Sequence, residues 1–231
     1  MKDLLVKIAL LLFPLFLFSQ EHDLFFSDAI KINFKKYSSE SNLAYKNKDF
    51  KRGKFLFDSL VKGQLVGTKF DNYSFKKIQG GKLNLESSKK PIFLLTYASW
   101  CVPSKGEIPA LNKLAQKYSN DVKFVVLFWD KKHNVKKVAK KFSSHITVCF
   151  AHETYKNDAP AISSIKHTLG FPTCFYLDEH LKIVDIKRGG GNSGPSVAYM
   201  KAYTQNYNAF RDGLSTILIN KNISKERLAT N

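Results

Sequence analysis

The sequence predicts an α/β fold in which a mixed central β-sheet is flanked by helices and preceded by a helical extension. From Gly67, apolar strand-like runs alternate with helix-like runs, which is typical of strands joined through helices. The last two strand-like runs are separated only by the turn Asp178–His180, so we expect them to form an antiparallel hairpin. The chain of 231 residues is long enough for one domain with such an addition.

The first 19 residues have the pattern of a secretory signal peptide. Lys2 and Lys7 form a basic start, Ile8–Phe18 is an apolar run of 11 residues, and cleavage is expected after Ser19. A membrane-spanning helix needs about 20 apolar residues, so this run is too short to cross a bilayer. An uncleaved anchor is the alternative, which Lys7 disfavours because it lies inside the extended apolar run. We therefore expect an exported protein, which is periplasmic if its source is a Gram-negative bacterium.

Residues 20–62 are predicted to form the helical extension. Ala29–Tyr37 has weak helical spacing, and Asn42–Val61 is the better helix candidate because its apolar residues recur at helical intervals between lysines. Gly63 is placed to end this helix. We expect the extension to pack on the main domain, residues 63–220, and residues 221–231 to form a polar, frayed tail.

The main domain is expected to contain several central strands, because some of its apolar runs are almost continuous and indicate burial on both faces of a sheet. Pro109 should kink the helix in which it lies. The glycine-rich stretch Gly189–Gly194 is predicted to be a loop. The expected strands are Phe70–Ile78, Lys82–Leu85, Pro91–Tyr97, Val122–Trp129, Ile146–Phe150, Thr173–Leu177 and Leu181–Ile186, and the expected helices are Pro103–Tyr118, Val135–Phe142, Ala159–Leu169 and Val197–Ile217.

The chain is strongly basic, with a formal net charge of +18. Such a surface favours peripheral association with anionic membranes or acidic proteins, although a lysine-rich solvated surface is the simpler interpretation. Nucleic acid is not expected as a partner, because the export signal and the lack of a recognisable nucleic-acid module argue against it. No metal site and no cofactor are predicted, since the histidines are scattered without the spacing of metal ligands: His133, His145, His152 and His167.

Cys101 is the residue on which the functional hypothesis depends. It follows the buried strand Pro91–Tyr97 and precedes the helix expected from Pro103, where unpaired backbone N–H groups and the helix dipole favour a thiolate. The alternative for a lone cysteine is a buried, inert side chain. The chain has three cysteines, and in an exported protein an odd count leaves at least one thiol free or available for intermolecular bonding.

Four motifs occur in order between Val66 and Ile217. They are Tyr97-Ala-Ser-Trp-Cys101 after a buried strand, Cys101-x-Pro103 continuing to Glu107-Ile108-Pro109, Gly170-Phe171-Pro172-Thr173 before a strand, and the hairpin Asp178–Ile186. Together they resemble the redoxin branch of the thioredoxin superfamily, in particular the exported TlpA-like thiol-disulfide oxidoreductases and cytochrome c maturation factors.

The resemblance implies a thioredoxin fold and thiol-disulfide exchange through Cys101. It also implies a cis peptide bond before Pro172, with this proline lying against the Cys101 sulfur. The Phe171 backbone would then hydrogen bond to an incoming peptide strand. The substrate-binding residues expected from the resemblance are Trp100, Pro103, Phe171 and Pro172.

Ser104 departs from the family pattern, in which the position three residues after the nucleophile is normally a second cysteine. Its hydroxyl could donate to the Cys101 thiolate and lower the thiol pKa, but it cannot attack a mixed disulfide. Three outcomes remain open: an external thiol resolves the mixed disulfide, another cysteine resolves it, or redox turnover is lost and the site holds a partner. Cys174 is the possible internal resolving residue, although it lies about 6.6 Å beyond Pro172 along a strand and should be buried. Cys149 is expected in the core.

Glu107 lies six residues after Cys101. In the cytochrome-maturation relatives a glutamate at this spacing is implicated in proton transfer, so the resemblance implies a general base or a group that tunes the thiol. A solvated helix glutamate is an equally good interpretation. Thioredoxin itself carries an aspartate six residues before its nucleophile, whereas Leu95 occupies that position here. A peroxiredoxin motif would need Thr or Ser at Ala98 and Pro at Leu94, so a peroxidase is not expected.

We therefore predict an exported thiol-disulfide oxidoreductase or isomerase that acts as a monothiol, with Cys101 as nucleophile and with Ser104 and Glu107 beside it. Its partners are expected to be exported proteins with thiols or disulfides, or low-molecular-weight thiols. The alternative is a redox-inactive binding module that holds an exported partner in the cis-proline groove. The first hypothesis predicts a lowered Cys101 pKa, and the second predicts that partner capture survives Cys101→Ala.

Overall fold

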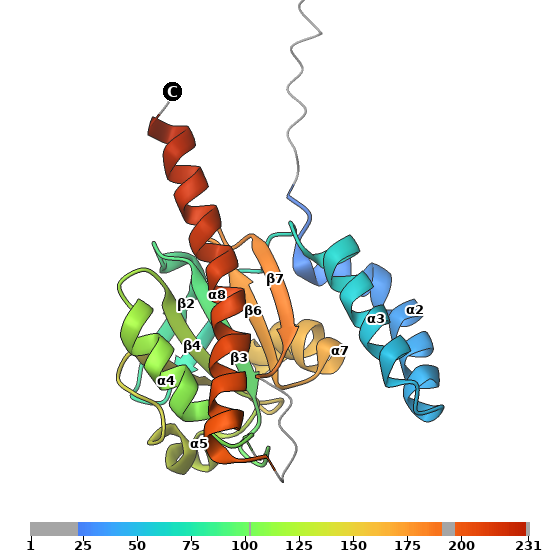
Figure 1. Ribbon diagram of the computed structural model, residues 1–231, viewed down its shortest axis with the longest axis horizontal. Helices are drawn as coiled ribbons and strands as arrows, with labels where there is room; N and C mark the ends of the chain where they lie inside the picture. The colour runs from blue at the N-terminus through green and yellow to red at the C-terminus, as the bar shows by residue number, and fades with distance from the viewer. Residues whose placement is uncertain (1–22, 102, 191–196, 230–231) are drawn as a thin grey trace, which may run out of the picture.

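The computed structural model describes residues 23–101, 103–190 and 197–229 (Figure 1). The predicted signal peptide and residues 191–194 of the predicted glycine loop lie outside these ranges. The described chain contains a mixed sheet of seven strands in the order β2-β1-β5-β4-β3-β6-β7, with helices on both faces. This is the α/β architecture predicted from the sequence.

The central strands follow the apolar runs of the sequence. β3, β4 and β5 are parallel, and β6 pairs antiparallel with β3. All side chains of β3 and β6 are buried, as expected for strands covered on both faces. The predicted closing hairpin is confirmed, because β6 and β7 pair antiparallel. The strands are β1 (Ser74–Lys77), β2 (Lys82–Asn84), β3 (Ile92–Tyr97), β4 (Lys123–Phe128), β5 (Ile146–Phe150), β6 (Thr173–Leu177) and β7 (Ile183–Arg188).

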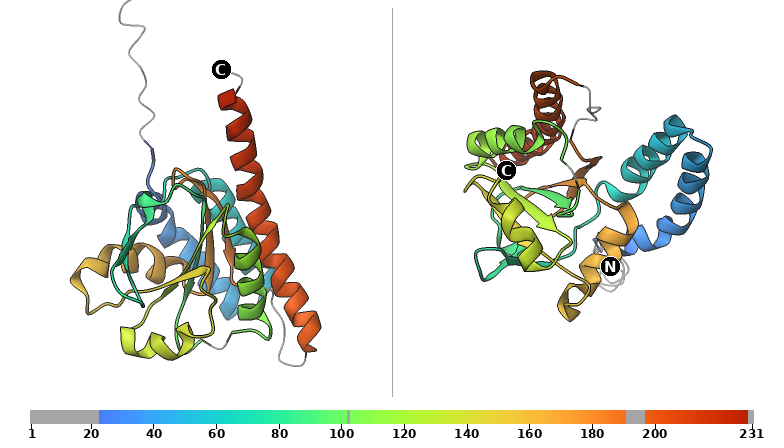
Figure 2. Two further views of the ribbon diagram at one scale, coloured as in Figure 1. Left: turned by 90° about the vertical axis from the view of Figure 1, so that its left-hand side faces the viewer. Right: turned by 90° about the horizontal axis from the view of Figure 1, so that it is seen from below.

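One face of the sheet is covered by α4 (Glu107–Tyr118) and α8 (Tyr199–Ala229), which lie side by side (Figure 2). The smaller α5 (Lys132–Ala139) contributes Val135 to the same core. Phe210 of α8 packs edge to face against a ring of the central strand β3, with ring centroids 5.8 Å apart. α8 is therefore an integral part of this layer.

α4 begins at Glu107, four residues later than predicted. Gly106 precedes it with a φ of 73°, and a Cβ on this residue would lie 2.8 Å from the Cα of Tyr203 in α8. Any residue other than glycine would be both strained and crowded there. Pro109 consequently lies in the first turn, where its missing N–H costs no intrahelical bond. The reason for the predicted kink thus disappears.

The opposite face is covered by the N-terminal extension, in which α2 (Phe26–Lys46) and α3 (Phe50–Leu60) form a helical hairpin that continues into a π-helical turn, η2 (Val61–Leu65). The single helix predicted over residues 42–61 was wrong. Lys48 breaks it with a φ of 57°, and the Asp49 side chain caps α3 by accepting from the backbone N–H of Arg52 at 2.9 Å.

The helix predicted over residues 159–169 is present but irregular, because a π-helical turn interrupts it, and it ends at Gly170 as expected. This stretch also covers the face on which α2 lies. The remaining short segments are η3 (Leu85–Ser87), η4 (Lys156–Asp158), α6 (Ala159–Ala161), η5 (Ile162–Lys166) and α7 (His167–Leu169).

α8 continues to Ala229, well past the predicted end at Ile217 and through most of the stretch predicted to be a frayed tail. After Gly213 the sequence holds neither glycine nor proline, so nothing local stops the helix. Its C-terminal part projects beyond the sheet (Figures 1 and 2). Of the helices that the structure describes, none combines the length and apolar character needed to span a bilayer.

Candidate active site

Cys101 lies in the loop that joins β3 to α4, with a partly exposed side chain. Its backbone N–H donates to the carbonyl of Ala98 at 3.0 Å. Asp130 holds the same loop: one carboxylate oxygen accepts from the backbone N–H of Ser99 at 2.6 Å, and the other accepts from the Ser99 hydroxyl at 2.9 Å. Sequence reasoning missed Asp130. Its place just after β4 was a usable signal, because the ends of parallel strands meet at one edge of a sheet.

The pKa of the Cys101 thiol is raised above its ordinary value, which contradicts the prediction of a lowered pKa. Burial is the main cause, and the negative charges of Asp130 and Glu107 raise the pKa further, whereas the hydrogen bond at Ala98 opposes them. The prediction failed because α4 begins at Glu107, six residues after Cys101. A helix dipole acts mainly within its first turn, so the thiol gains little from it.

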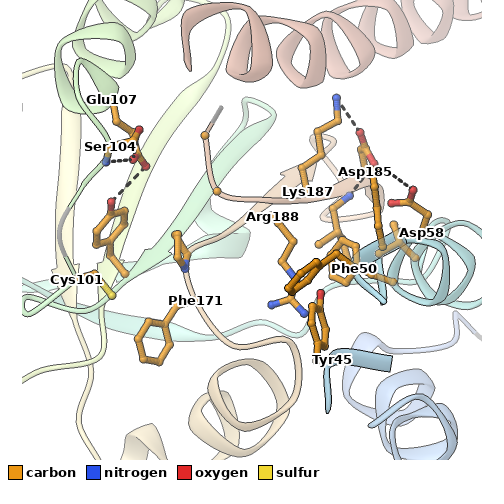
Figure 3. Close-up of a pocket in the computed structure, with 18 of the residues that line it drawn as sticks. Tyr45, Phe50, Asp58, Cys101, Ser104, Glu107, Phe171, Asp185, Lys187 and Arg188 are labelled. Carbon is orange, nitrogen blue, oxygen red and sulfur yellow. Dashed lines mark hydrogen bonds and ion pairs between the residues drawn. The ribbon is translucent and has the colours of Figure 1, made fainter. Parts of the chain in front are cut away.

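Ser104 is bonded to a polar cluster and not to the thiol. Its backbone N–H and its hydroxyl donate to Glu107 Oε2 at 2.9 and 3.0 Å (Figure 3). Its hydroxyl oxygen accepts from Nδ2 of Asn206 at 2.9 Å. The predicted hydrogen bond from Ser104 to Cys101 is therefore not formed, because the hydroxyl proton is directed to the cluster.

Glu107 is buried, with only 5% of its surface exposed, which excludes the interpretation as a solvated helix residue. Besides its bonds with Ser104, it accepts from the Tyr97 hydroxyl at 3.3 Å. Burial, reinforced by the charge of Glu107, raises the pKa of Tyr97, so this phenol stays protonated and remains a donor. Glu107 thus ties the end of β3, the Cys101 loop and the start of α4 together.

Asn206 joins this cluster from α8, 102 residues after Ser104. Its side chain is fully buried, and its Nδ2 also lies 3.1 Å from the Lys105 carbonyl and 2.9 Å from the Ala202 carbonyl. Sequence reasoning missed this residue. A signal did exist, because Ala202, Asn206 and Phe210 recur every four residues on the buried stripe of α8, where a polar side chain needs a partner.

Trp100, Phe171 and Pro172 line the same groove as Cys101. The peptide bond between Phe171 and Pro172 is cis. The rings of Trp100 and Phe171 meet edge to face with centroids 5.5 Å apart, and 72% of Trp100 is exposed. Pro103, which was predicted to bind substrate with them, is not among the described residues that line the groove.

Cys174 is buried in the core, as its position on the strand suggested. It has no exposed surface, its thiol donates to the Gly189 carbonyl at 3.4 Å, and burial raises its pKa. Cys101 and Cys174 are both free thiols, and a resolving role for Cys174 would require the core to open. Cys149 is also buried as predicted, and burial raises its pKa to about 12.

The groove has a volume of about 1300 Å³ and extends from Cys101 to the N-terminal extension (Figure 3). β7 contributes Lys187 and Arg188 to its middle, and Tyr45 and Phe50 lie at its far side. Sequence reasoning assigned no function to the extension, and none of these four residues was predicted to belong to the site.

A mixed sheet with a thiol after its central strand and a cis-proline loop beside that thiol defines a thioredoxin-like protein. The chain belongs to the Redoxin family, whose model matches residues 65–203. The match covers all seven strands, Cys101 and the loop of Pro172. It confirms the resemblance drawn from the four motifs, and it leaves α2 and α3 outside the matched residues.

The chain is similar to several thiol-disulfide proteins. It is 27% identical to the thioredoxin-like protein YneN of Bacillus subtilis over 124 residues, 53% of this chain and 71% of that protein. It is 25% identical to the thiol-disulfide oxidoreductase ResA of Bacillus thuringiensis subsp. konkukian over 142 residues, 60% of this chain and 79% of that protein. Among solved structures, the thioredoxin domain of a thiol-disulfide oxidoreductase from Bacteroides vulgatus matches with a TM-score of 0.49 and 17% identity, covering 64% of this chain and 96% of that one.

Proposed function

We propose that this protein is an exported thiol-disulfide oxidoreductase or isomerase that works as a monothiol through Cys101. The observation that carries the proposal is the placement of the three thiols: Cys101 lines the groove, whereas Cys149 and Cys174 are buried. Membership of the Redoxin family and similarity to relatives named as thiol-disulfide oxidoreductases support the reaction class.

The proposed reaction is an exchange. The Cys101 thiolate attacks one sulfur of a substrate disulfide, the substrate S–S bond breaks, and the other substrate sulfur leaves as a thiolate that takes a proton from water. Cys101 is then held in a mixed disulfide. Ser104 has no sulfur with which to attack it, so an external thiol attacks instead, forms a new disulfide with the substrate sulfur and returns Cys101 to the thiol state.

The raised pKa makes the Cys101 thiolate a minor species at neutral pH. A thiolate of higher pKa is the stronger nucleophile, which offsets part of this loss. Glu107 supports the reaction by anchoring the loop through Ser104, while its charge disfavours the thiolate. We therefore propose that Glu107 positions the Cys101 loop and tunes the pKa of the Cys101 thiol.

The location and partners follow from the same proposal. The basic start and the short apolar run of residues 1–19 support export, and export supplies substrates whose disulfides persist. The proposed substrates are exported proteins with disulfides or thiols, and low-molecular-weight thiols. Fractionation of the source cells tests export, since a protein that stays in the cytosol with an intact N-terminus would contradict it.

The test uses a small aromatic disulfide whose release as a coloured thiolate reports attack, together with intact-mass measurement of the acid-quenched protein. Native protein should gain one adduct at Cys101, Cys101→Ser should gain none, and Cys174→Ala should behave like the native protein. An adduct that forms equally well in Cys101→Ser would overturn the proposal. Acid-quenched trapping in cells then identifies the natural partner of Cys101.

The second candidate is a binding module without turnover, which the raised Cys101 pKa and the Ser104 substitution favour. It predicts that a partner captured from cells is retained by Cys101→Ala with unchanged yield. Under the monothiol proposal, the same variant should lose the disulfide-linked partner completely.

A further inference from the structure

The far wall of the active-site groove is built by the N-terminal extension. On α3 the residues that line the groove recur at helical spacing and so share one face of the helix. That face carries Phe50, Lys54, Phe57, Asp58 and, at the junction with η2, Val61. The Redoxin family match begins at residue 65, so this wall is an addition to the matched domain.

Two aromatic residues of this wall are held in an exposed position. The Tyr45 ring packs against Gly53, where a Cβ would lie 2.9 Å from the ring, so the glycine makes room for it. Glycine is unfavourable inside a helix, and the close approach of the Tyr45 ring gives a reason for its presence at this position. The Tyr45 and Phe50 rings have centroids 6.1 Å apart, with 47% and 66% of these residues exposed.

Arg188 fixes the hairpin to the domain that carries Cys101. Its guanidinium donates to the Leu169 carbonyl, which precedes the loop of Pro172, and to the Tyr37 hydroxyl of α2 at 3.1 Å. It also lies over the Phe57 ring of α3, 4.5 Å from the ring centroid. These contacts join β7, α2, α3 and the end of α7 at one residue, so the aromatic wall has a fixed place relative to Cys101.

The groove therefore has two aromatic pairs, and Figure 3 shows Phe171 of one pair on the Cys101 side of Arg188 and Tyr45 and Phe50 of the other pair beside the extension. Trp100 and Phe171 lie beside Cys101, and Tyr45 and Phe50 lie on the extension. Its volume of about 1300 Å³ exceeds that of typical small-molecule pockets, about 300–1,000 Å³, and suits a stretch of polypeptide.

The charge of the wall favours an acidic occupant. Of the charged residues of the extension that line the groove, Lys54 and Lys62 are basic and Asp58 is acidic. Lys54 pairs with Asp58 at the groove, whereas the exposed Lys62 has no carboxylate partner within the described residues. An acidic group at this end would pair with Lys62 without competing with an existing ion pair.

We propose that the groove binds an extended, cysteine-containing segment of a protein substrate, with a large apolar side chain on the Tyr45–Phe50 pair and acidic residues toward Lys62. Its cysteine would lie beside Cys101 and Phe171. The extension then selects substrates by what flanks the cysteine. The exchange at Cys101 rests on the function proposed above, whereas binding in the groove does not.

The first test compares peptide disulfides that release the same coloured thiolate when Cys101 attacks the peptide sulfur. One peptide carries an aromatic residue and acidic residues beside its cysteine, one replaces the acidic residues by lysines, and one lacks the aromatic residue. The reference is the same disulfide of free cysteine, which is too short to reach α3. Native protein should react fastest with the acidic aromatic peptide, and equal rates for all three peptides would overturn the proposal.

Matched variants in the N-terminal extension locate the effect. Phe50→Ala should lower the ratio of peptide rate to reference rate about tenfold, because it removes most of an apolar contact. Phe55→Ala removes a phenylalanine of similar exposure on the same helix that does not line the groove, and should leave the ratio unchanged. Lys62→Gln should remove most of the preference for acidic residues, and Lys51→Gln, at an exposed lysine that does not line the groove, should not. Equal effects of the two lysine variants, or of the two phenylalanine variants, would overturn the placement.

A binding measurement separates this inference from the reaction. A labelled acidic aromatic peptide with serine in place of cysteine should bind the Cys101→Ser protein, as followed by fluorescence anisotropy, and Phe50→Ala should weaken this binding about tenfold. If the reference disulfide fails to react while the peptide binds, the proposed reaction falls and the groove proposal stands. If the reference reacts and the peptide does not bind, the groove proposal falls alone. A dimer that dissociates on Phe50→Ala would show that a second copy occupies the groove, which also overturns it.

Discussion

The two sides of the Cys101 loop differ in what their side chains do. On the groove side, the Cys101 thiol is partly exposed and faces an open volume between aromatic residues. On the other side, called here the cluster side, Ser104 also lines the groove and is partly buried, but its backbone N–H and its hydroxyl are both bonded to Glu107, and its oxygen also accepts from Asn206. The Cys101 thiol is available for reaction, whereas Ser104 holds the loop in place. Ser104 is thus part of a buried polar cluster as well as the replacement for a second thiol.

The largest predicted effect comes from placing a thiol on the cluster side, at position 104. In Ser104→Cys, the new thiol should attack the mixed disulfide at Cys101, so that the adduct no longer accumulates and an intramolecular disulfide forms instead. Intact-mass measurement after acid quenching reads both products. The control is Ser104→Cys combined with Cys101→Ser, which should form neither. Persistence of the adduct in Ser104→Cys would mean that the cluster, and not the missing sulfur, prevents resolution.

Removing Asn206, which anchors the cluster side, should lower the stability of the protein. Asn206→Ala removes a fully buried amide together with its bonds to the Ser104 hydroxyl and to the carbonyls of Lys105 and Ala202. We expect the free energy of unfolding to fall by about 2–3 kcal/mol, measured by urea denaturation. Thr204→Ala, on the exposed face of the same helix, should change it by less than about 0.5 kcal/mol. Equal losses in the two variants would contradict the importance assigned to the cluster.

The smallest predicted effect concerns the negative charge of Glu107, which acts on the Cys101 thiol. Glu107→Gln keeps an acceptor for Ser104 but removes a negative charge that raises the Cys101 pKa. The pKa should therefore fall, and the curve of alkylation rate against pH should shift toward lower pH, with severalfold faster alkylation at neutral pH. Glu179→Gln, in the turn between β6 and β7, should leave the curve in place. A shift toward higher pH in Glu107→Gln would reverse the assigned role of this charge.

The sequence predicted the sheet well because burial on both faces leaves continuous apolar runs. β3, β5 and β6 were placed to within one residue at each end. The helix boundaries were less predictable, since they depend on positive φ values at Lys48 and Gly106 and on the close approach of Tyr203. These are properties of the packed chain and leave only a weak local signal.

Only part of the candidate site could be predicted, because the sequence reveals local motifs but not the distant residues that pack against them. Cys101, Ser104, Glu107 and Phe171 belong to short motifs that can be read locally, whereas their partners come from distant segments. Asn206 reaches Ser104 from 102 residues away, and Phe50 reaches the groove only because α2 and α3 fold back onto the domain. The error in the Cys101 pKa had the same origin, because it followed from the misplaced start of α4.

The most direct test of the central claim is the lifetime of the Cys101 mixed disulfide in the native protein. Purified protein is converted to the adduct with the small aromatic disulfide, freed of reagent, and followed by intact-mass measurement with and without an added thiol. Because Ser104 has no sulfur and Cys174 is fully buried, the adduct should persist in buffer and should disappear only when external thiol is added. Loss of the adduct in buffer alone, with formation of a disulfide between Cys101 and Cys174, would contradict the monothiol account.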